Sequence, residues 1–78
     1  MQIQFKNLEE IGKYINIVSS DRYKGVDINL SSDRYLIDGK SILGAMTLGC
    51  GKILNTEILT DNAELKFVFE TDMKVFEV

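Results

Sequence analysis

Residues 40–49 have the sequence Lys40-Ser41-Ile42-Leu43-Gly44-Ala45-Met46-Thr47-Leu48-Gly49. This stretch predicts one short helix. Ser41 is a suitable N-cap, because its hydroxyl can accept a backbone N–H of the first turn. Gly49 is a suitable end, because glycine tolerates the left-handed conformation in which many helices terminate.

Apolar residues occupy more than one side of this predicted helix. Ile42, Ala45, Met46 and Gly49 fall on one side at helical spacing, and Leu43 and Thr47 fall on an adjacent side. A single short helix cannot bury both sides, so we expect one apolar side to face a partner. The alternative, in which all of these residues belong to the core, fits the spacing equally well.

The same stretch resembles the regulatory-serine segment of HPr, the small phosphocarrier of the bacterial sugar phosphotransferase system. In low-GC Gram-positive members of that family the segment is Lys-Ser-Ile-Met-Gly-Val-Met-Ser-Leu-Gly or close to it. The resemblance covers roughly residues 9 to 60 and is strongest at 40 to 49. Residues Tyr23 to Leu30 also resemble the second strand of the family and its lead-in.

The composition of the chain excludes several classes of function. The 78 residues are enough for a single domain, 1–78, and the net charge of −3 provides no basic stripe for nucleic acid. No apolar run could span a bilayer, and a signal peptide is not apparent. With one cysteine and no histidine, neither a zinc site nor a Cys-His nucleophile can be assembled. We therefore expect a cytoplasmic, non-enzymatic protein that uses no metal or cofactor and binds neither membrane nor nucleic acid.

Local patterns predict the remaining elements. Alternation of apolar and polar residues predicts four strands, at Met1 to Lys6, Gly25 to Leu30, Arg34 to Asp38 and Ile53 to Leu59. A helix is expected after Asn7, which is a competent N-cap with Glu10 three residues later. Residues 61–78 fit two structures. A helix over Asn62 to Met73 with a cap at Asp61 is favoured, and a strand over 64–70 is the alternative.

The order of elements predicts the fold class. The pattern β-α-β-β-α-β-α, with two strands joined as a hairpin, is typical of an α+β fold in which helices cover one face of an antiparallel sheet. The resemblance to HPr implies the same architecture, an open-faced sandwich with a four-stranded sheet in the order 1-4-2-3.

The phosphocarrier site of the family is absent from the chain. HPr carries phosphate on a histidine at the start of its first helix, followed by an arginine and a proline. Those positions correspond here to the residues around Leu8, Glu9 and Glu10, which we interpret as a degenerate site. Two carboxylates there would repel phosphate, so we expect no histidine-type phosphocarrier activity. A phosphoryl-transfer component that works without histidine stays an alternative function.

The regulatory serine keeps its sequence context. The resemblance implies that the serine kinase of the HPr system phosphorylates Ser41, and that the product binds a regulator of carbon catabolite control. It also implies a partner-binding surface formed by Lys40, Ile42, Leu43, Met46 and Thr47. Phosphate would add nearly two negative charges at a helix N-terminus. The sequence thus predicts a regulatory or adaptor protein. The alternative is an HPr-fold binding module without a phosphotransfer role, in which Ser41 is only a cap.

Overall fold

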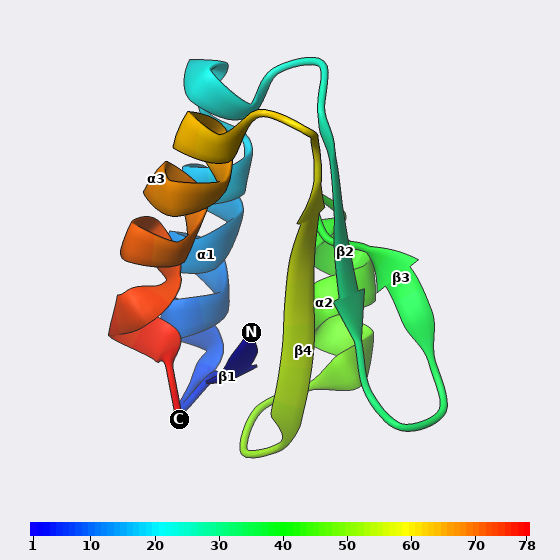
Figure 1. Ribbon diagram of the computed structural model, residues 1–78. Coiled ribbons are helices and arrows are strands. Elements are labelled where there is room, and N and C mark those ends of the chain that lie inside the picture. The colour runs from blue at the N-terminus through cyan, green and yellow to red at the C-terminus, as the bar shows by residue number, and fades with distance from the viewer.

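The computed structural model describes all residues, 1–78, and confirms the predicted order of elements (Figure 1). The elements are β1 (Gln2–Gln4), α1 (Leu8–Val18), β2 (Asp27–Ser31), β3 (Leu36–Asp38), α2 (Ile42–Leu48), β4 (Ile53–Leu59) and α3 (Ala63–Met73). Two single-turn 3₁₀ helices follow α1 and α3, at Asp21–Tyr23 and Lys74–Phe76.

Side-chain caps begin the helices. The Asn7 side chain accepts the Glu10 N–H at 3.0 Å, and the Glu10 carboxylate accepts the Lys6 N–H at 2.8 Å. The first hydrogen bond satisfies a donor that the first turn of α1 leaves free, and the second ties the residue before the cap to that turn. The third helix begins one residue later than expected. Its cap is Asn62, whose side chain accepts the Leu65 N–H at 3.0 Å, and not Asp61.

The four strands form one antiparallel sheet in the order β1-β4-β2-β3. The central pair is β2 with β4, in a register that places Ile28 opposite Ile58 and Leu30 opposite Thr56. The expected sheet order 1-4-2-3 is therefore confirmed. It makes β3 one edge of the sheet (Figure 1).

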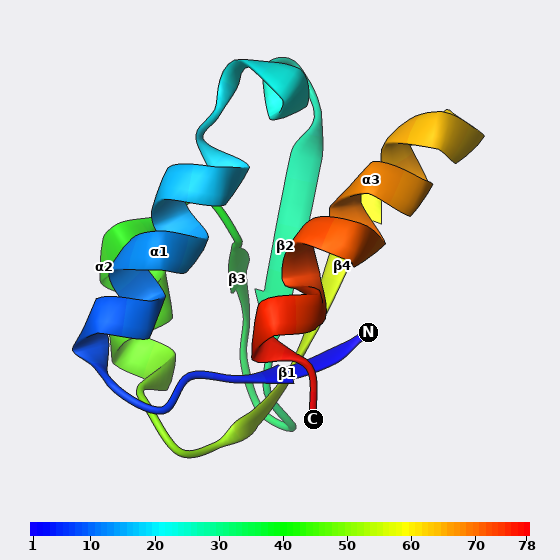
Figure 2. The same ribbon diagram turned by 90° about the vertical axis from the view of Figure 1, so that its left-hand side faces the viewer.

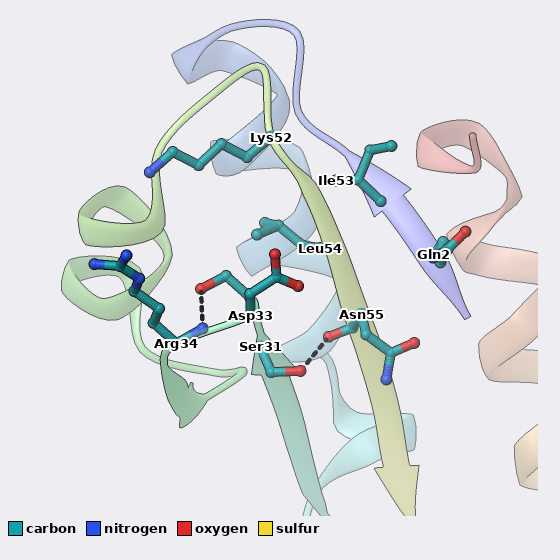
Figure 3. Close-up of a pocket in the computed structure, with 9 residues that line it drawn as sticks. Gln2, Ser31, Asp33, Arg34, Lys52, Ile53, Leu54 and Asn55 are labelled. Carbon is teal, nitrogen blue, oxygen red and sulfur yellow. Dashed lines mark hydrogen bonds between the residues drawn. The ribbon is translucent and has the colours of Figure 1, made fainter.

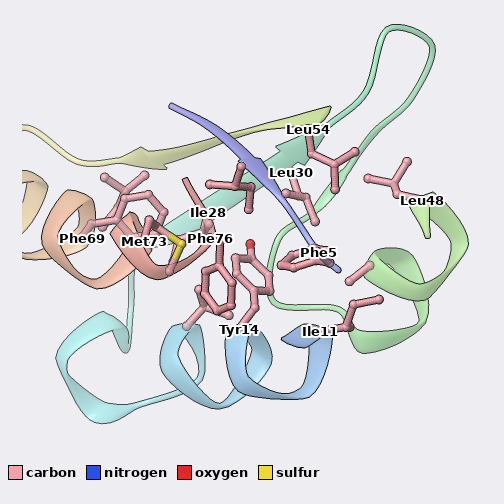
Figure 4. Close-up of a cluster of buried hydrophobic side chains, with 14 of the residues drawn as sticks. Phe5, Ile11, Tyr14, Ile28, Leu30, Leu48, Leu54, Phe69, Met73 and Phe76 are labelled. Atoms are coloured by element: carbon pink, nitrogen blue, oxygen red, sulfur yellow. The ribbon is translucent and has the colours of Figure 1, made fainter. Parts of the chain in front are cut away.

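The three helices cover one face of this sheet and leave the other face open (Figures 2 and 4). Alternate residues of β4 are buried against the helices, as predicted, at Leu54, Thr56 and Ile58. Fifteen buried hydrophobic residues form one continuous core between sheet and helices. Its aromatic centre stacks Phe5, Tyr14 and Phe76 in tilted and edge-to-face pairs, with ring centroids 5.2 to 6.1 Å apart.

The C-terminal segment is helical, and the alternative of a strand over 64–70 is wrong. The helical spacing buries Phe69 and Met73 in the core, whereas Phe67 points away from the core and is exposed. After α3 the chain bends back to β1. There Glu77 forms a bridge with Ile3, and the Val78 N–H donates to the Gln2 carbonyl at 3.3 Å.

The turn from β3 into α2 brings the backbone very close to the core. The Gly39 N–H donates to the Ile28 carbonyl at 2.6 Å. A Cβ on Gly39 would lie 2.8 Å from that carbonyl oxygen and 2.8 Å from the Tyr14 hydroxyl, distances that side chains do not adopt. Only glycine fits there, so this position fixes where α2 begins.

We expect Gly39→Ala to lower the free energy of unfolding by about 1–3 kcal/mol, because the added methyl overpacks a site bounded by backbone. Gly12→Ala is the matched control, since a Cβ on Gly12 in α1 meets no atom within 4 Å. That variant should be more stable by about 0.5–1 kcal/mol. Urea unfolding followed by circular dichroism measures both. Equal midpoints for the two variants would contradict the close approach.

Two buried tyrosines predict loss of stability at alkaline pH. Burial raises the pKa of Tyr14 from 10.0 to about 12. A hydrogen bond from Thr56 would lower this pKa, but the Thr56 hydroxyl donates to the Asn29 carbonyl. Burial and a 2.6 Å hydrogen bond to Asp72 also raise the pKa of Tyr23. At a pH between the tyrosine pKa of the unfolded chain and the raised pKa of the folded chain, each of these tyrosines is protonated in the folded chain and deprotonated in the unfolded chain. Stability is therefore complete below pH 10 and falls above it.

For Tyr14 this fall amounts to about 1.4 kcal/mol per pH unit between its two pKa values. Tyr14→Phe should remove that contribution from the slope. The variant should cost little at neutral pH, because the Tyr14 hydroxyl is buried without a hydrogen-bond partner. Urea unfolding between pH 9 and pH 12 measures both slopes. Identical slopes for the variant and the natural chain would refute this account.

Candidate functional site

Ser41 lies at the start of α2 with its hydroxyl proton free. Its Oγ accepts the Gly44 N–H at 3.1 Å, which is the predicted N-cap. Its own N–H donates to the Asp38 carbonyl at 3.0 Å. The Ser41 O–H donates no hydrogen bond to another group of the chain.

One side of α2 faces inward. Ala45 and Leu48 are buried in the core, and Gly44 faces β3. A Cβ on Gly44 would lie 2.8 Å from Cδ1 of Ile37, so the helix approaches β3 through this glycine. Because Gly44, Ala45 and Leu48 form the inward side of α2, Ile42, Leu43 and Met46 turn outward.

The outward side of α2 carries four of the five predicted partner-binding residues: Ile42, Leu43, Met46 and Thr47 are all exposed, Leu43 at 74%. The interpretation in which this whole stretch belongs to the core is therefore wrong. Thr47 adds no free donor, because its hydroxyl donates to the Leu43 carbonyl at 2.8 Å. The surface is consequently apolar, with Ser41 at one end.

Lys40 lies apart from this surface. Its ammonium group donates to the Tyr23 carbonyl at 2.6 Å, in a partly buried contact. Its backbone N–H donates to a carboxylate oxygen of Asp38 at 2.9 Å. Lys40 thus ties the α2 start to the segment after α1, and the Asp38 carboxylate lies on the same turn as Ser41. Sequence spacing gave no sign of this, because the contact joins residues that are far apart in the chain.

Leu8, Glu9 and Glu10, which the sequence analysis predicted to be a degenerate phosphocarrier site, lie in the first turn of α1. Leu8 and Glu9 are exposed, and Glu10 is half-buried with its carboxylate on the Lys6 N–H. The Asn7 side chain takes the Glu10 N–H. One backbone donor of the first turn, the Glu10 N–H, is therefore bonded within the chain, and acidic side chains stand beside it.

The structure does not bring the two predicted sites together. α1 and α2 lie side by side, but α2 runs so that its end lies near the start of α1 (Figure 2). The Gly51 N–H, just past α2, donates to the Phe5 carbonyl at 2.8 Å. Lys40, beside Ser41, bonds instead to Tyr23, beyond the end of α1. Ser41 and the Leu8–Glu10 segment therefore lie at opposite ends of the helix pair.

A polar hollow of about 600 Å³ was not expected from the sequence (Figure 3). It lies between the β2–β3 turn and the start of β4. Arg34 and Lys52 contribute its two cations, and Asp33 its carboxylate. Only the pairing of β2 with β4 brings these turns together, so no local sequence pattern identifies them. The hollow is open to solvent and no buried polar side chain is left unpaired in it.

None of the three helices has both the length and the apolar composition that crossing a membrane requires. Comparison of the chain with protein-family models, curated proteins and solved structures found no match. The resemblance to HPr therefore rests on residues 40–49 and Tyr23 to Leu30 and on the order of helices and strands.

We expect Ser41→Ala to lower the free energy of unfolding by about 1 kcal/mol, because it leaves the Gly44 N–H without its cap. Ser41→Asp should retain the stability of the natural chain, since a carboxylate oxygen can accept the same N–H. Chemical denaturation of the three proteins measures the difference. If all three unfold at the same denaturant concentration, the Ser41 side chain contributes nothing as a cap.

Proposed function

We propose that this chain is an HPr-like regulatory or adaptor protein of the bacterial sugar phosphotransferase system. In this proposal it docks a protein partner through Ile42, Leu43 and Met46, and phosphorylation of Ser41 switches the docking. Such a role belongs in the cytoplasm, where the serine kinase of the HPr system and a catabolite-control regulator would be its partners.

The observation that carries the proposal is the outward exposure of three large apolar side chains on a helix capped by serine. Ile42, Leu43 and Met46 share one surface of α2, and the core does not need them. Methionine and leucine side chains adapt to differently shaped partners, which suits a docking surface. The resemblance at residues 40–49 supports a protein kinase and a regulator as the partners.

Local charges favour recognition of the phosphate by a partner and not by the chain itself. A phosphoserine at position 41 would carry nearly two negative charges beside the Asp38 carboxylate, which repels it. The Lys40 ammonium could reach it only by leaving the Tyr23 carbonyl. The phosphate would therefore be exposed to solvent next to the apolar surface, where a cationic group of the partner can bind it.

The arrangement at the start of α1 also favours a regulatory role over phosphate carriage. A phosphocarrier holds its phosphate with backbone N–H groups and a cation. Here the Asn7 side chain already occupies the Glu10 N–H, and the Glu9 and Glu10 carboxylates place negative charge in the first turn.

Phosphorylation tests the switch directly. The purified chain is incubated with the serine kinase of the HPr system and ATP, and its intact mass is measured. We expect one added phosphate on the natural chain and none on Ser41→Ala. The Ser41→Ala protein must first be shown to be folded by circular dichroism, because it loses its cap.

Docking is tested with the phosphorylated chain and the catabolite-control regulator. Leu43→Lys should weaken binding at least tenfold, because it places a charge in the apolar surface. Leu59→Lys is the matched control, since Leu59 is an exposed leucine of β4 outside this surface. A folded chain that accepts no phosphate would refute the switch. Equal binding by the two leucine variants would refute docking through α2.

A further inference from the structure

The polar hollow beside the β2–β3 turn holds two cations that have no partner in the chain. Arg34 and Lys52 line the hollow, and neither forms an ion pair, because the one ion pair of the chain joins Arg22 to Asp72. The hydrogen bond at Arg34 uses its backbone N–H, which donates to the Ser32 hydroxyl at 3.4 Å, and not its guanidinium group. Both charges are therefore available to a ligand.

The two cationic side chains extend toward the same side of the hollow (Figure 3). They come from different parts of the chain, Arg34 from the turn between β2 and β3 and Lys52 from the loop before β4. The pairing of Ser31 with Asn55 brings the two segments together. Guanidinium groups bind the oxygens of phosphate or carboxylate through two parallel hydrogen bonds, and an ammonium group adds a point charge. This side of the hollow therefore suits an oxygen-rich anion.

Uncharged polar groups line the opposite side of the hollow. The Asn55 side-chain oxygen accepts the Met1 amino group at 2.9 Å, so the side-chain NH₂ group of Asn55 remains free to donate. The Gln2 side chain lies on the same side (Figure 3). The Asp33 carboxylate also lines the hollow, where it can accept hydroxyl groups and would repel a second anionic group. The rest of a ligand should therefore be neutral and carry hydroxyl groups.

The size of the hollow favours a ligand larger than a free ion. Its volume of about 600 Å³ lies within the range of small-molecule sites. Ile53 and Leu54 are the only apolar residues of the lining, so a mainly apolar ligand does not fit its chemistry.

The open face of the sheet is unfavourable for anions away from the hollow. Toward its other end, the strand register places Asp38 and Glu57 on either side of Asn29. Carboxylates repel an anion, whereas unpaired cations attract it. Charge thus directs an anion on this face to the hollow.

We propose that the hollow binds a small phosphate ester that carries hydroxyl groups. The phosphate group lies between Arg34 and Lys52, and the hydroxyl groups bond to Asn55 and Asp33. All four side chains are exposed to solvent, so a dissociation constant of about 1 mM is expected. The proposal does not involve Ser41, so its outcome is independent of the proposed function.

Titration of the isotope-labelled chain, followed by two-dimensional NMR, tests the site. Glycerol 3-phosphate is the probe, and inorganic phosphate and glycerol are titrated separately. With glycerol 3-phosphate we expect saturable shifts of the backbone amides of residues 32–34 and 52–55. Inorganic phosphate should bind the same residues more weakly, because it lacks the hydroxyl groups, and glycerol should cause no saturable shift.

Charge-removing variants identify the residues that hold the phosphate. Arg34→Gln and Lys52→Gln should each raise the dissociation constant at least fivefold, because each removes a cation that faces the phosphate. Lys24→Gln is the matched control. It changes the net charge equally, but Lys24 precedes β2, whereas the hollow lies past the end of that strand. All three positions are exposed, and unchanged amide spectra of the free variants confirm that they fold.

Three outcomes overturn the proposal. The first is a set of shifts that grow without saturation. The second is equal binding of inorganic phosphate and glycerol 3-phosphate, which would indicate an adventitious ion only. The third is equal affinity of Lys52→Gln and Lys24→Gln, which would indicate an effect of net charge and not of the hollow.

Discussion

The close approach of Gly39 to β2 is the constraint on which the candidate site depends. With no side chain at that position, the backbone can lie against the Ile28 carbonyl and the Tyr14 hydroxyl. The chain leaves β3 immediately afterward, and the Asp38 carbonyl receives the Ser41 N–H. Ser41 then caps a helix whose direction is already set. A larger residue would move the start of α2 and with it the outward surface.

Much of the fold was predictable because its signals are local. Caps at Asn7 and Ser41 mark helix starts, and alternation at Leu54, Thr56 and Ile58 marks the buried side of β4. The last helix was harder to predict, because Phe67, which is exposed, fits the alternating pattern of a strand and not the apolar face of the helix. Burial of Phe69 and Met73 decides between the two, and this depends on where the core lies.

The candidate site was predictable only in part, because its geometry depends on contacts between distant residues. Which side of α2 faces the core follows from the fit of Gly44 against Ile37, and spacing alone did not reveal it. Lys40 precedes Ser41 in the sequence and was expected on the same partner-binding surface, yet its ammonium group bonds to the Tyr23 carbonyl. The lining of the polar hollow and the free edge of β3 likewise follow from the order of strands.

The position of β1 has a consequence for how the chain folds during synthesis. β1 is synthesised before the other elements, but its strand partner is β4, in which Gln2 pairs with Asn55. Its bridge from Ile3 to Glu77 needs the C-terminal residues as well. Contacts between residues so far apart in sequence form slowly, because a long loop must close first. On the ribosome, the segment from α1 to β3 can collapse early while the first strand stays without a partner. Completion of the sheet is therefore a late event, reached only after nearly the whole chain has emerged.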